Sequence, residues 1–139
     1  MVKTYDPKNV SLIVGGKIIG GFTDGTFITA ERNEAMWNLK VGVDGIGTRA
    51  KTNNTSGKIT IVLHQSSNSN DDLSALAAAD ELANSGAVPV LLRDNSGRTL
   101  CTALTAWIQK YANAEFGKEV SNRTWVMETD QLVIFDGGN

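Results

Sequence analysis

The sequence predicts an α+β protein that is mainly β, with one α-helix. Apolar and polar residues alternate in residues 37–43 and 58–64, which is the period of a half-buried β-strand. Shorter apolar runs are separated by glycine pairs such as Gly15-Gly16, which are typical of turns between strands. Only residues 71–85 combine helical spacing with signals for a start and a stop. The length of 139 residues suits one hydrophobic core, so we expect a single domain over residues 1–139.

Composition and charge exclude several classes of function. Apolar residues make up 41% of the chain and charged residues 20%, as in soluble globular proteins. The formal net charge of −2 argues against tight binding of nucleic acid over a large surface. The single cysteine, Cys101, rules out an internal disulfide, and we expect it to be a buried, inert thiol. The chain lacks both the apolar core of a signal peptide and a run near the roughly 20 residues of a membrane span, so we expect a soluble protein made in the cytoplasm.

Short strands are expected along much of the chain. Residues 10–14 and 17–19 should form a hairpin around Gly15-Gly16, and a turn at Asp24-Gly25 should precede a strand at residues 26–29. The other expected strands are residues 88–93, 125–129 and 132–135, and the last two of these form either two strands or one long bent strand.

Residues 99–111 fit two structures. Five apolar residues stand at helical spacing and slightly favour a helix: Leu100, Leu104, Trp107, Ile108 and Tyr111. The threonines at positions 99, 102 and 105, together with the preceding turn at residues 94–97, favour a strand instead. The residue pattern leaves both structures open.

The helix is expected at residues 71–85. Asp71 and Asp72 suit its positive N-terminal end, and Gly86 is the expected C-terminal cap. The expected buried face is rich in alanine, which suits close packing on a sheet: Ala75, Leu76, Ala79, Leu82 and Ala83.

Residues 37–65 are expected to form a long projecting hairpin. Residues 37–43 and 58–64 are its predicted paired arms, and residues 45–57 its glycine- and threonine-rich tip. A connection of this length in a compact domain is usually functional or disordered. Because the tip has almost nothing of its own to bury, we expect a second subunit to contact it.

No residue pattern indicates catalysis, a cofactor or a metal. His64 is the only histidine, and a triad with Ser66 and Asp71 has no supporting motif. Asp71 and Asp72 suit a helix N-terminus better than a calcium loop, whose ligands are spaced over alternate residues. The glycine clusters lie between expected strands, whereas a phosphate-binding loop joins a strand to a helix. The residues alone therefore indicate a β-rich structural or binding domain with a projecting arm.

The chain resembles the tail tube proteins of contractile-tailed bacteriophages. The resemblance lies in four blocks in the expected order: residues 5–16 (YDPKNVSLIVGG), 21–28 (GFTDGTFI), 115–120 (EFGKEV) and 124–129 (TWVMET). It implies a fold similar to that of the type VI secretion tube protein, with two packed antiparallel sheets or a partly closed β-barrel flanked by the helix. It also implies that the segment matching residues 99–110 is a strand.

The resemblance further implies a non-enzymatic virion protein without a cofactor. In this family six copies form a ring, the inner sheets join into a β-lined channel, and rings stack into the inner tail tube. The arm, here residues 40–58, reaches a neighbouring ring. The implied partners are other copies, the sheath, the baseplate, the tail terminator, and the tape measure protein and DNA that pass through the lumen. The alternative is the tube of a phage-tail-like bacteriocin or a contractile secretion system.

Charge suggests how copies contact one another. Residues 40–58 carry Lys40, Arg49, Lys51 and Lys58 against Asp44 alone, a net +3, whereas residues 71–85 carry four acidic residues and no basic one, a net −4. We therefore expect the hairpin tip to contact another subunit, with the acidic helix as a possible partner. The expected contact residues of the tip are Gly45, Gly47, Arg49, Lys51, Asn53 and Asn54, and those of the helix are Asp71, Asp72, Asp80 and Glu81. The alternative is that the charged side chains of both segments are simply exposed to solvent and contact no other copy.

Overall fold

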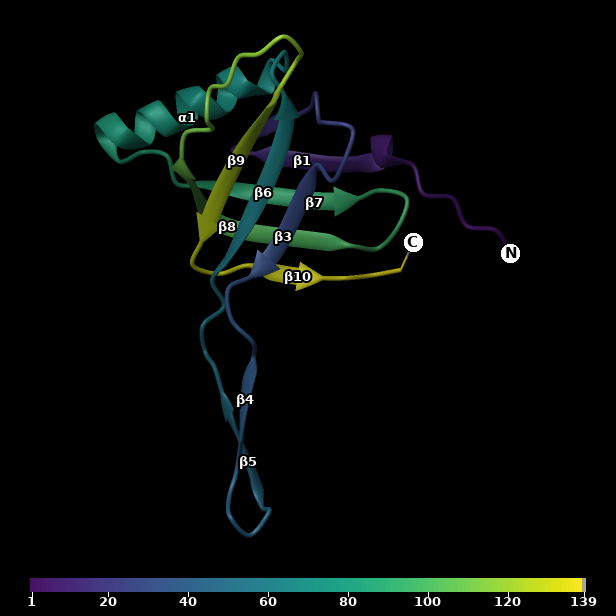
Figure 1. Cartoon of the computed structure of the whole chain (residues 1–139), viewed down its shortest axis with the longest axis vertical. Coiled ribbons are helices and arrows are strands. Elements are labelled where there is room, and N and C mark those ends of the chain that lie inside the picture. Colours follow the sequence, from purple (N-terminus) through teal and green to yellow (C-terminus); the bar gives the residue numbers. More distant parts are fainter. Residues whose placement is uncertain (139) are drawn as a thin grey trace.

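A computed structural model describes residues 1–138 of the chain, and β-strands dominate it (Figure 1). A short 3-10 helix, η1 (Pro7–Asn9), is followed by β1 (Val10–Val14), β2 (Lys17–Ile19), β3 (Ile28–Arg32), β4 (Trp37–Val41), β5 (Gly47–Lys51), β6 (Gly57–His64), α1 (Ser69–Ala83), β7 (Val88–Asp94), β8 (Leu100–Lys110), β9 (Asn122–Thr129) and β10 (Val133–Phe135). The expected mainly β fold with one α-helix is confirmed for the described residues.

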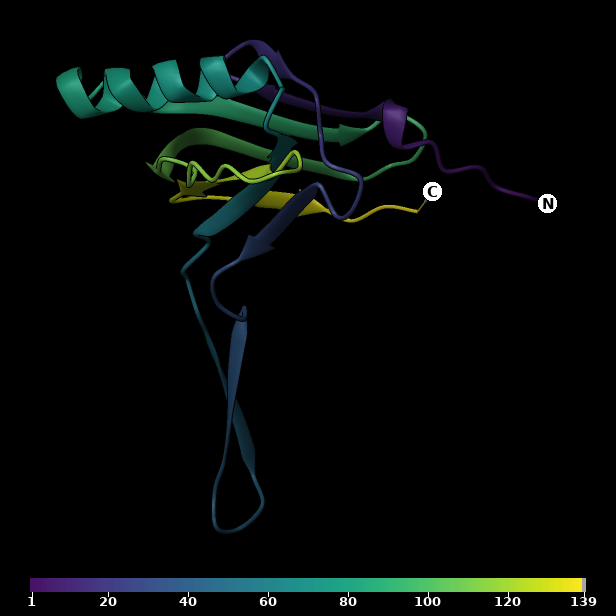
Figure 2. The same cartoon turned by 45° about the horizontal axis from the view of Figure 1, so that its top comes forward.

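Eight of the strands form one antiparallel sheet that folds over on itself. The strand order is β2-β1-β7-β8-β9-β6-β3, and β10 also pairs with β8. The fold lies at β8, because its first half pairs with β7 and β10 whereas residues 106–110 pair with β9. Two layers result, with β3, β6 and β9 crossing over the layer that contains β1, β7, β8 and β10 (Figures 1 and 2). The order ends at β2 and β3, so the sheet stays open and does not close into a barrel.

The core lies between these two layers. Its fully buried side chains come from both layers, from α1 and from the segment before β10: Leu12, Ile59, Ile61, Leu63, Leu73, Met127 and Leu132. Trp125 is also buried, and its indole Nε1 donates a hydrogen bond to Asn70 Oδ1 at 3.0 Å. This bond satisfies the polar atom of a large apolar side chain and ties β9 to the first turn of α1.

The helix begins at Ser69, two residues before the predicted start, and ends at Ala83, two residues before the predicted end. Its C-terminal cap is Asn84, which has a left-handed φ of 55°, rather than the predicted Gly86. Its buried residues are Ser69, Leu73 and Ala77, none of which belongs to the predicted face. Of the predicted face, Leu76 does pack against the core, whereas Leu82 is 87% exposed. The reason is that the alanines of α1 lie on several sides of the helix, so the sequence does not single out one apolar face. The packing against β2 and β8 decides which residues are buried, and Ser69 is among them because its Oγ accepts from Gly20 N at 2.9 Å.

The ambiguous residues 99–111 form the strand β8, as the family resemblance implied. The helical spacing misled because most of the apolar residues that carry it are not in the core: Leu100, Leu104 and Tyr111 are 39%, 85% and 44% exposed. The buried positions of β8 are instead Cys101, Ala103, Ala106 and Ile108. A bulge, at which Ala103 pairs with Val90 and Ala106 with Val88, shifts the strand alternation by one residue between Ala103 and Ala106.

The projecting hairpin exists, but its predicted pairing is wrong. β4 (Trp37–Val41) pairs with β5 (Gly47–Lys51), which the sequence analysis assigned to the tip. β6 (Gly57–His64), the predicted second arm, lies in the main sheet between β3 and β9. The β4–β5 hairpin is therefore a separate two-stranded sheet, inserted between β3 and β6.

Candidate assembly surfaces

The β4–β5 hairpin extends from one end of the molecule, away from the two layers of the body (Figures 1 and 2). Every residue of both strands is exposed. Three apolar side chains share one face, and Leu39 and Val41 on this face are 73% and 59% exposed. The members of this face are Trp37, Leu39 and Val41 on β4, opposite Lys51, Arg49 and Gly47 on β5. An isolated two-stranded hairpin is at best marginally stable in water, so this face is suited to contact with another molecule.

Basic side chains lie on the same face as the apolar ones. The Arg49 guanidinium carbon lies 3.9 Å from the centroid of the Trp37 ring, and the Lys51 ammonium lies 6.0 Å from it. Cation–π contacts of this kind hold both charges over the ring while leaving them in solvent. The face therefore combines apolar area with positive charge.

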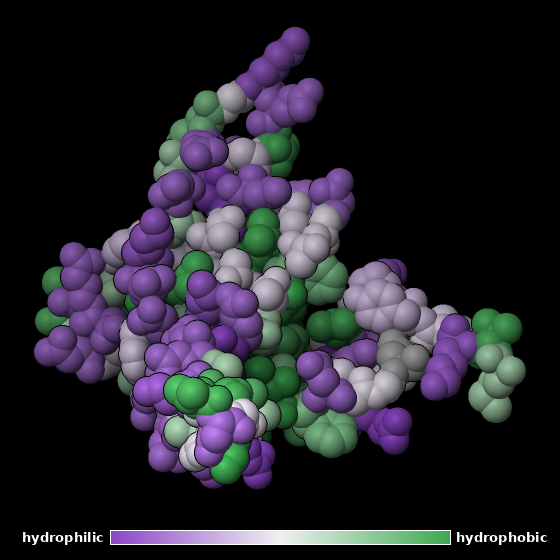
Figure 3. Space-filling view, turned by 60° about the horizontal axis from the view of Figure 1, so that its bottom comes forward, coloured by the Kyte–Doolittle hydropathy of each residue, from purple (hydrophilic) through white to green (hydrophobic). Residues whose placement is uncertain are grey.

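The tip of the hairpin is residues 42–46. Gly45 has a left-handed φ of 84°, which favours glycine, and its N–H donates to the Gly42 carbonyl at 3.0 Å. Val43 and Ile46 are strongly exposed there. Figure 3 looks onto this end of the molecule and shows hydrophobic side chains gathered at the tip among hydrophilic ones.

Three residues lie outside the hairpin tip, although the sequence analysis placed them in the tip or counted them in its net charge. Asn53 and Asn54 lie at the base of the hairpin, where Asn54 Oδ1 accepts from the backbone N and the Oγ of Ser56. Lys58 lies on β6, where its Nζ is 3.4 Å from Glu31 Oε1. The hairpin itself therefore carries three basic residues against one acidic residue, a net +2 rather than +3.

Three of the four acidic residues of α1 have partners within the chain. Asp72 Oδ1 pairs with Lys17 Nζ at 3.3 Å, and Asp80 Oδ1 accepts from Gly86 N at 3.2 Å. Glu81 Oε2 accepts from the Tyr111 hydroxyl at 3.1 Å. Asp71 is exposed in the first turn. The helix is thus a negatively charged surface whose carboxylates also stabilise the local fold.

The helix and the hairpin lie at opposite ends of the longest axis of the molecule (Figure 1). The sequence-predicted contact residues therefore form two separate groups, and the structure does not bring them together within one copy. A contact between the groups requires two copies arranged head to tail. Such a contact joins unlike surfaces, so it continues from copy to copy.

The two outward sheet faces differ in polarity. The face of β3, β6 and β9 is polar, with Lys58 standing between Glu31 and Glu128 and with Thr60 beside Thr29. The other outward face, on β1, β2, β7, β8 and β10, is more apolar: Ile13, Ile18, Leu91, Leu100, Val133 and Phe135. One face is therefore suited to water and the other to contact with protein.

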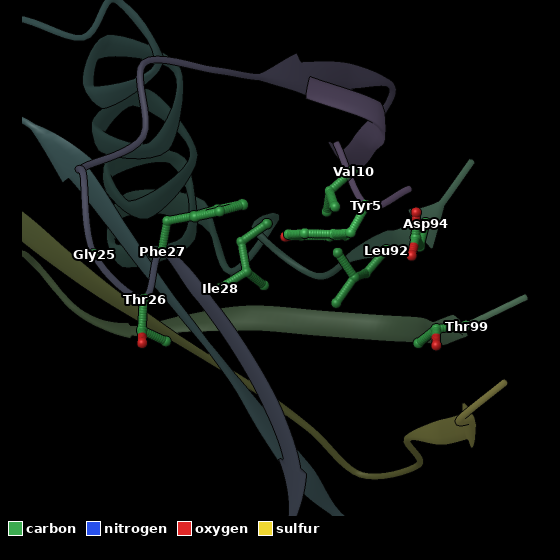
Figure 4. A pocket seen from close by; sticks show the side chains of 9 residues that line it. All are labelled: Tyr5, Val10, Gly25, Thr26, Phe27, Ile28, Leu92, Asp94 and Thr99. Atoms are coloured by element: carbon green, nitrogen blue, oxygen red, sulfur yellow. The ribbon is translucent and has the colours of Figure 1, made fainter. Parts of the chain in front are cut away.

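A pocket of about 470 Å³ opens at the edge between the two layers (Figure 4). Tyr5, Val10, Phe27, Ile28 and Leu92 give it a mostly apolar lining, and the Tyr5 side chain lies among them. No histidine or cysteine is among its lining residues. This pocket is a mostly apolar gap at an open edge of the folded sheet.

The remaining candidates in residues 1–138 are the His64 triad, a metal site and a membrane-spanning helix. His64 lies on β6, and among the described residues no side-chain hydrogen bond joins it to Ser66 or Asp71. No group of three or more His, Cys, Asp or Glu side chains in this range is placed to hold a metal. None of its helices has the length and apolar character to cross a membrane.

The fold is shared with chains in structures of contractile injection systems. A sheath–tube complex of the extracellular contractile injection system PVC in its extended state contains a chain that matches with a TM-score of 0.65 at 9% identity, covering 95% of this chain and 91% of that one. The sheath/tube terminator of the same system gives a TM-score of 0.66 at 10% identity, covering 97% and 99%. The tube-terminating cap of the anti-feeding prophage gives 0.63 at 9% identity, covering 97% and 93%.

The chain belongs to the bacteriophage PhiTE tail tube protein family, whose model matches residues 13–137. It is also 31% identical to structural protein ORF10 of Pseudomonas phage KPP10, over 98% of this chain and 83% of that protein. The resemblance found in the sequence is thereby confirmed, and the family is a structural one.

Proposed function

We propose that this chain is a non-enzymatic virion protein that polymerises, as a single domain, into the inner tube of a contractile tail. The observation that carries the proposal is the exposed hairpin, whose apolar and basic face projects from the end opposite the acidic helix. Such a molecule has complementary ends, so copies join head to tail.

Six copies form each ring, and rings stack into the tube. The unpaired edges of β2 and β3 are the places where neighbouring copies within a ring meet, because exposed strand edges are ready to pair. The polar face of β3, β6 and β9 faces the channel, and the more apolar outward face lies against protein. Lys58 between Glu31 and Glu128 leaves this channel wall with an acidic excess, which suits DNA that passes without binding.

The hairpin is the contact between rings. Arg49, Lys51 and the turn at Gly45 and Gly47 meet the acidic helix of a copy in the next ring, around Asp71. Asp72, Asp80 and Glu81 add negative potential to the same helix. Asn53 and Asn54 set the direction of the hairpin at its base rather than forming the contact itself.

The function of the tube is mechanical. The sheath contracts around it, the tube penetrates the cell envelope, and DNA then leaves through the lumen. The partners are the sheath, the baseplate, the tail terminator and the tape measure protein. The similarity to chains of the PVC particle favours one alternative, the tube of a tail-like device that carries no genome. The presence of capsid and terminase genes beside this gene distinguishes a phage from such a device.

Electron microscopy of the purified protein in negative stain tests the proposal. We expect rings, or tubes of uniform width with a stain-filled channel. A protein that stays monomeric over a wide range of concentrations and salt contradicts it. The same sample in sedimentation velocity gives the size of the ring before stacking.

A further inference from the structure

The loop of residues 112–121, between β8 and β9, displays two large apolar side chains. Phe116 is 80% exposed and Val120 is 67% exposed. Ten residues without regular structure are a long connection for a compact domain, and such connections are usually functional. Neither side chain contributes to the core cluster of the protein.

The loop is held in place although it is exposed. Arg123 is 9% exposed, and its guanidinium donates to the Glu115 carbonyl at 3.1 Å and to Ser121 Oγ at 2.7 Å. Gln65 Oε1 accepts from both the N and the Oγ of Ser121. The Arg123 guanidinium also lies 5.3 Å from the Phe116 ring centroid. These bonds fix the backbone on either side of Phe116 and Val120, so the exposed side chains are presented by an ordered surface.

The loop lies at the same end of the molecule as α1. It begins beside Tyr111, which donates to Glu81 near the end of the helix, and it ends at Ser121, which contacts Gln65 just before the helix. Figure 1 shows it at the end of the long axis remote from the hairpin. Its charged residues are Glu115, Lys118 and Glu119, a net −1 that adds to the negative charge of the helix.

We propose that the loop of residues 112–121 is the apolar part of the surface that receives the hairpin of a second copy. This inference rests on the proposed tube function and names the partner surface of the hairpin. Apolar side chains stand uncovered on both elements, the charges are opposite, and the two elements lie at opposite ends of the molecule. Phe116 and Val120 pack against the face formed by Trp37, Leu39 and Val41, and Arg123 acts as the positioning residue.

Site-specific photocrosslinking of assembled protein tests this contact. The photoreactive residue p-benzoylphenylalanine replaces Phe116, and tubes are grown from a mixture of nitrogen-15-labelled and unlabelled copies before irradiation. Mass spectrometry should find mixed-isotope links from position 116 to residues 36–52. The control places the same residue at Leu104, which is 85% exposed on β8, and should give no link to the hairpin.

A double variant, Phe116→Ser with Val120→Ser, measures the strength of the contact. Because burying one such side chain is worth tenfold or more in an equilibrium constant, the critical concentration for tube growth should rise at least about tenfold. Circular dichroism should show the parent fold, since both side chains are already exposed. Tubes whose position 116 links elsewhere, or a double variant that assembles like the parent, overturn the inference and leave the tube function standing. A parent protein that never assembles overturns both.

Discussion

At the scale of single residues, Cys101 lies on the inner face of β8 and is 3% exposed. Burial raises the pKa of its thiol above the ordinary value, and the negative charge of Asp136 raises it further. The thiolate is the form that reacts, so both effects suppress its reactivity near neutral pH. The expectation of a buried cysteine is confirmed, and its inertness stays a prediction.

We expect a thiol reagent to label Cys101 slowly in the native protein and rapidly after denaturation. Because the pKa is raised in the folded state, a smaller fraction of the thiol is ionised at any pH near neutrality, so the native protein should react more slowly than a free thiol at pH 7 and at pH 8. The measurement is the rate of absorbance change with a disulfide reagent, in buffer and in denaturant. Fast native labelling at neutral pH contradicts the prediction.

Gly57 shows how tightly the start of β6 fits the body. A Cβ at this position meets Leu132 Cδ2 at 2.6 Å and the Glu31 carbonyl at 2.7 Å. The carbonyl belongs to the backbone of β3 and cannot move aside without disturbing the β3–β6 ladder. The glycine is therefore needed for close approach rather than for a turn.

We predict that Gly57→Ala lowers the free energy of unfolding by about 1–3 kcal/mol, the usual cost of overpacking. Chemical denaturation followed by tryptophan fluorescence measures the change. Gly25→Ala is the matched control, because a Cβ there meets no atom within 4 Å, and it should change stability little. Equal effects of the two substitutions contradict the steric argument.

At the scale of elements, the sequence predicted most strands from their apolar residues and missed β5, which has almost none. Residues 10–14, 17–19 and 88–93 were found because their apolar side chains alternate or run together against the core. β5 was assigned to a loop because Gly47, Thr48, Arg49, Ala50 and Lys51 bury nothing within the copy. Its partner β4 is equally exposed but was predicted, because Trp37, Leu39 and Val41 alternate with polar residues as in a half-buried strand.

The base of the hairpin is where the body ends. Asn33 N donates to the Ser56 carbonyl, and Leu132 N donates to the Thr55 carbonyl, so residues 55 and 56 belong to the body. The segment between β3 and the hairpin has few backbone hydrogen bonds to the body. The first bond of the hairpin itself is the one that Thr52 N donates to the Met36 carbonyl. A deletion that includes residues 55 and 56 therefore also removes contacts of the body.

We predict that replacing residues 35–53 by Asn-Gly leaves a folded protein that cannot stack. The β3–β6 pairing and the bonds of Thr55 and Ser56 remain, so the unfolding free energy should stay within about 1 kcal/mol of the parent value, as for changes away from the core. Thermal unfolding and electron microscopy are the two measurements. Long tubes from this variant, or outright unfolding, contradict the role given to the hairpin.

At the scale of the whole molecule, the two ends have opposite charge. The predicted residues Arg49 and Lys51 lie on the hairpin, and Asp71 lies on the helix at the other end, as a contact between copies requires. The sequence did not indicate the loop around Phe116, because exposed and buried apolar residues look alike in a sequence. Only the packing reveals that Phe116 and Val120 are left uncovered.

The charges of the two ends should set the register of stacking. Individual exposed ion pairs contribute only about 0–1 kcal/mol, but every copy in a tube repeats the same contact. Ions screen such contacts over about 8 Å at physiological ionic strength. Moderate salt should therefore weaken assembly of the parent protein without preventing it, because apolar contacts remain.

We predict that Arg49→Glu with Lys51→Glu shortens the tubes or abolishes them at low salt. Sedimentation and tube length in electron micrographs, measured against salt concentration, give the effect. Lys3→Glu with Lys8→Glu is the matched control, since it changes the net charge equally at exposed positions on the N-terminal segment, away from the hairpin. The hairpin variant also loses the Arg49–Trp37 contact, so a further variant adds Asp71→Lys and should recover part of the growth by restoring opposite charges. If the doubly reversed variant polymerises like the parent at every salt concentration, apolar packing alone builds the tube.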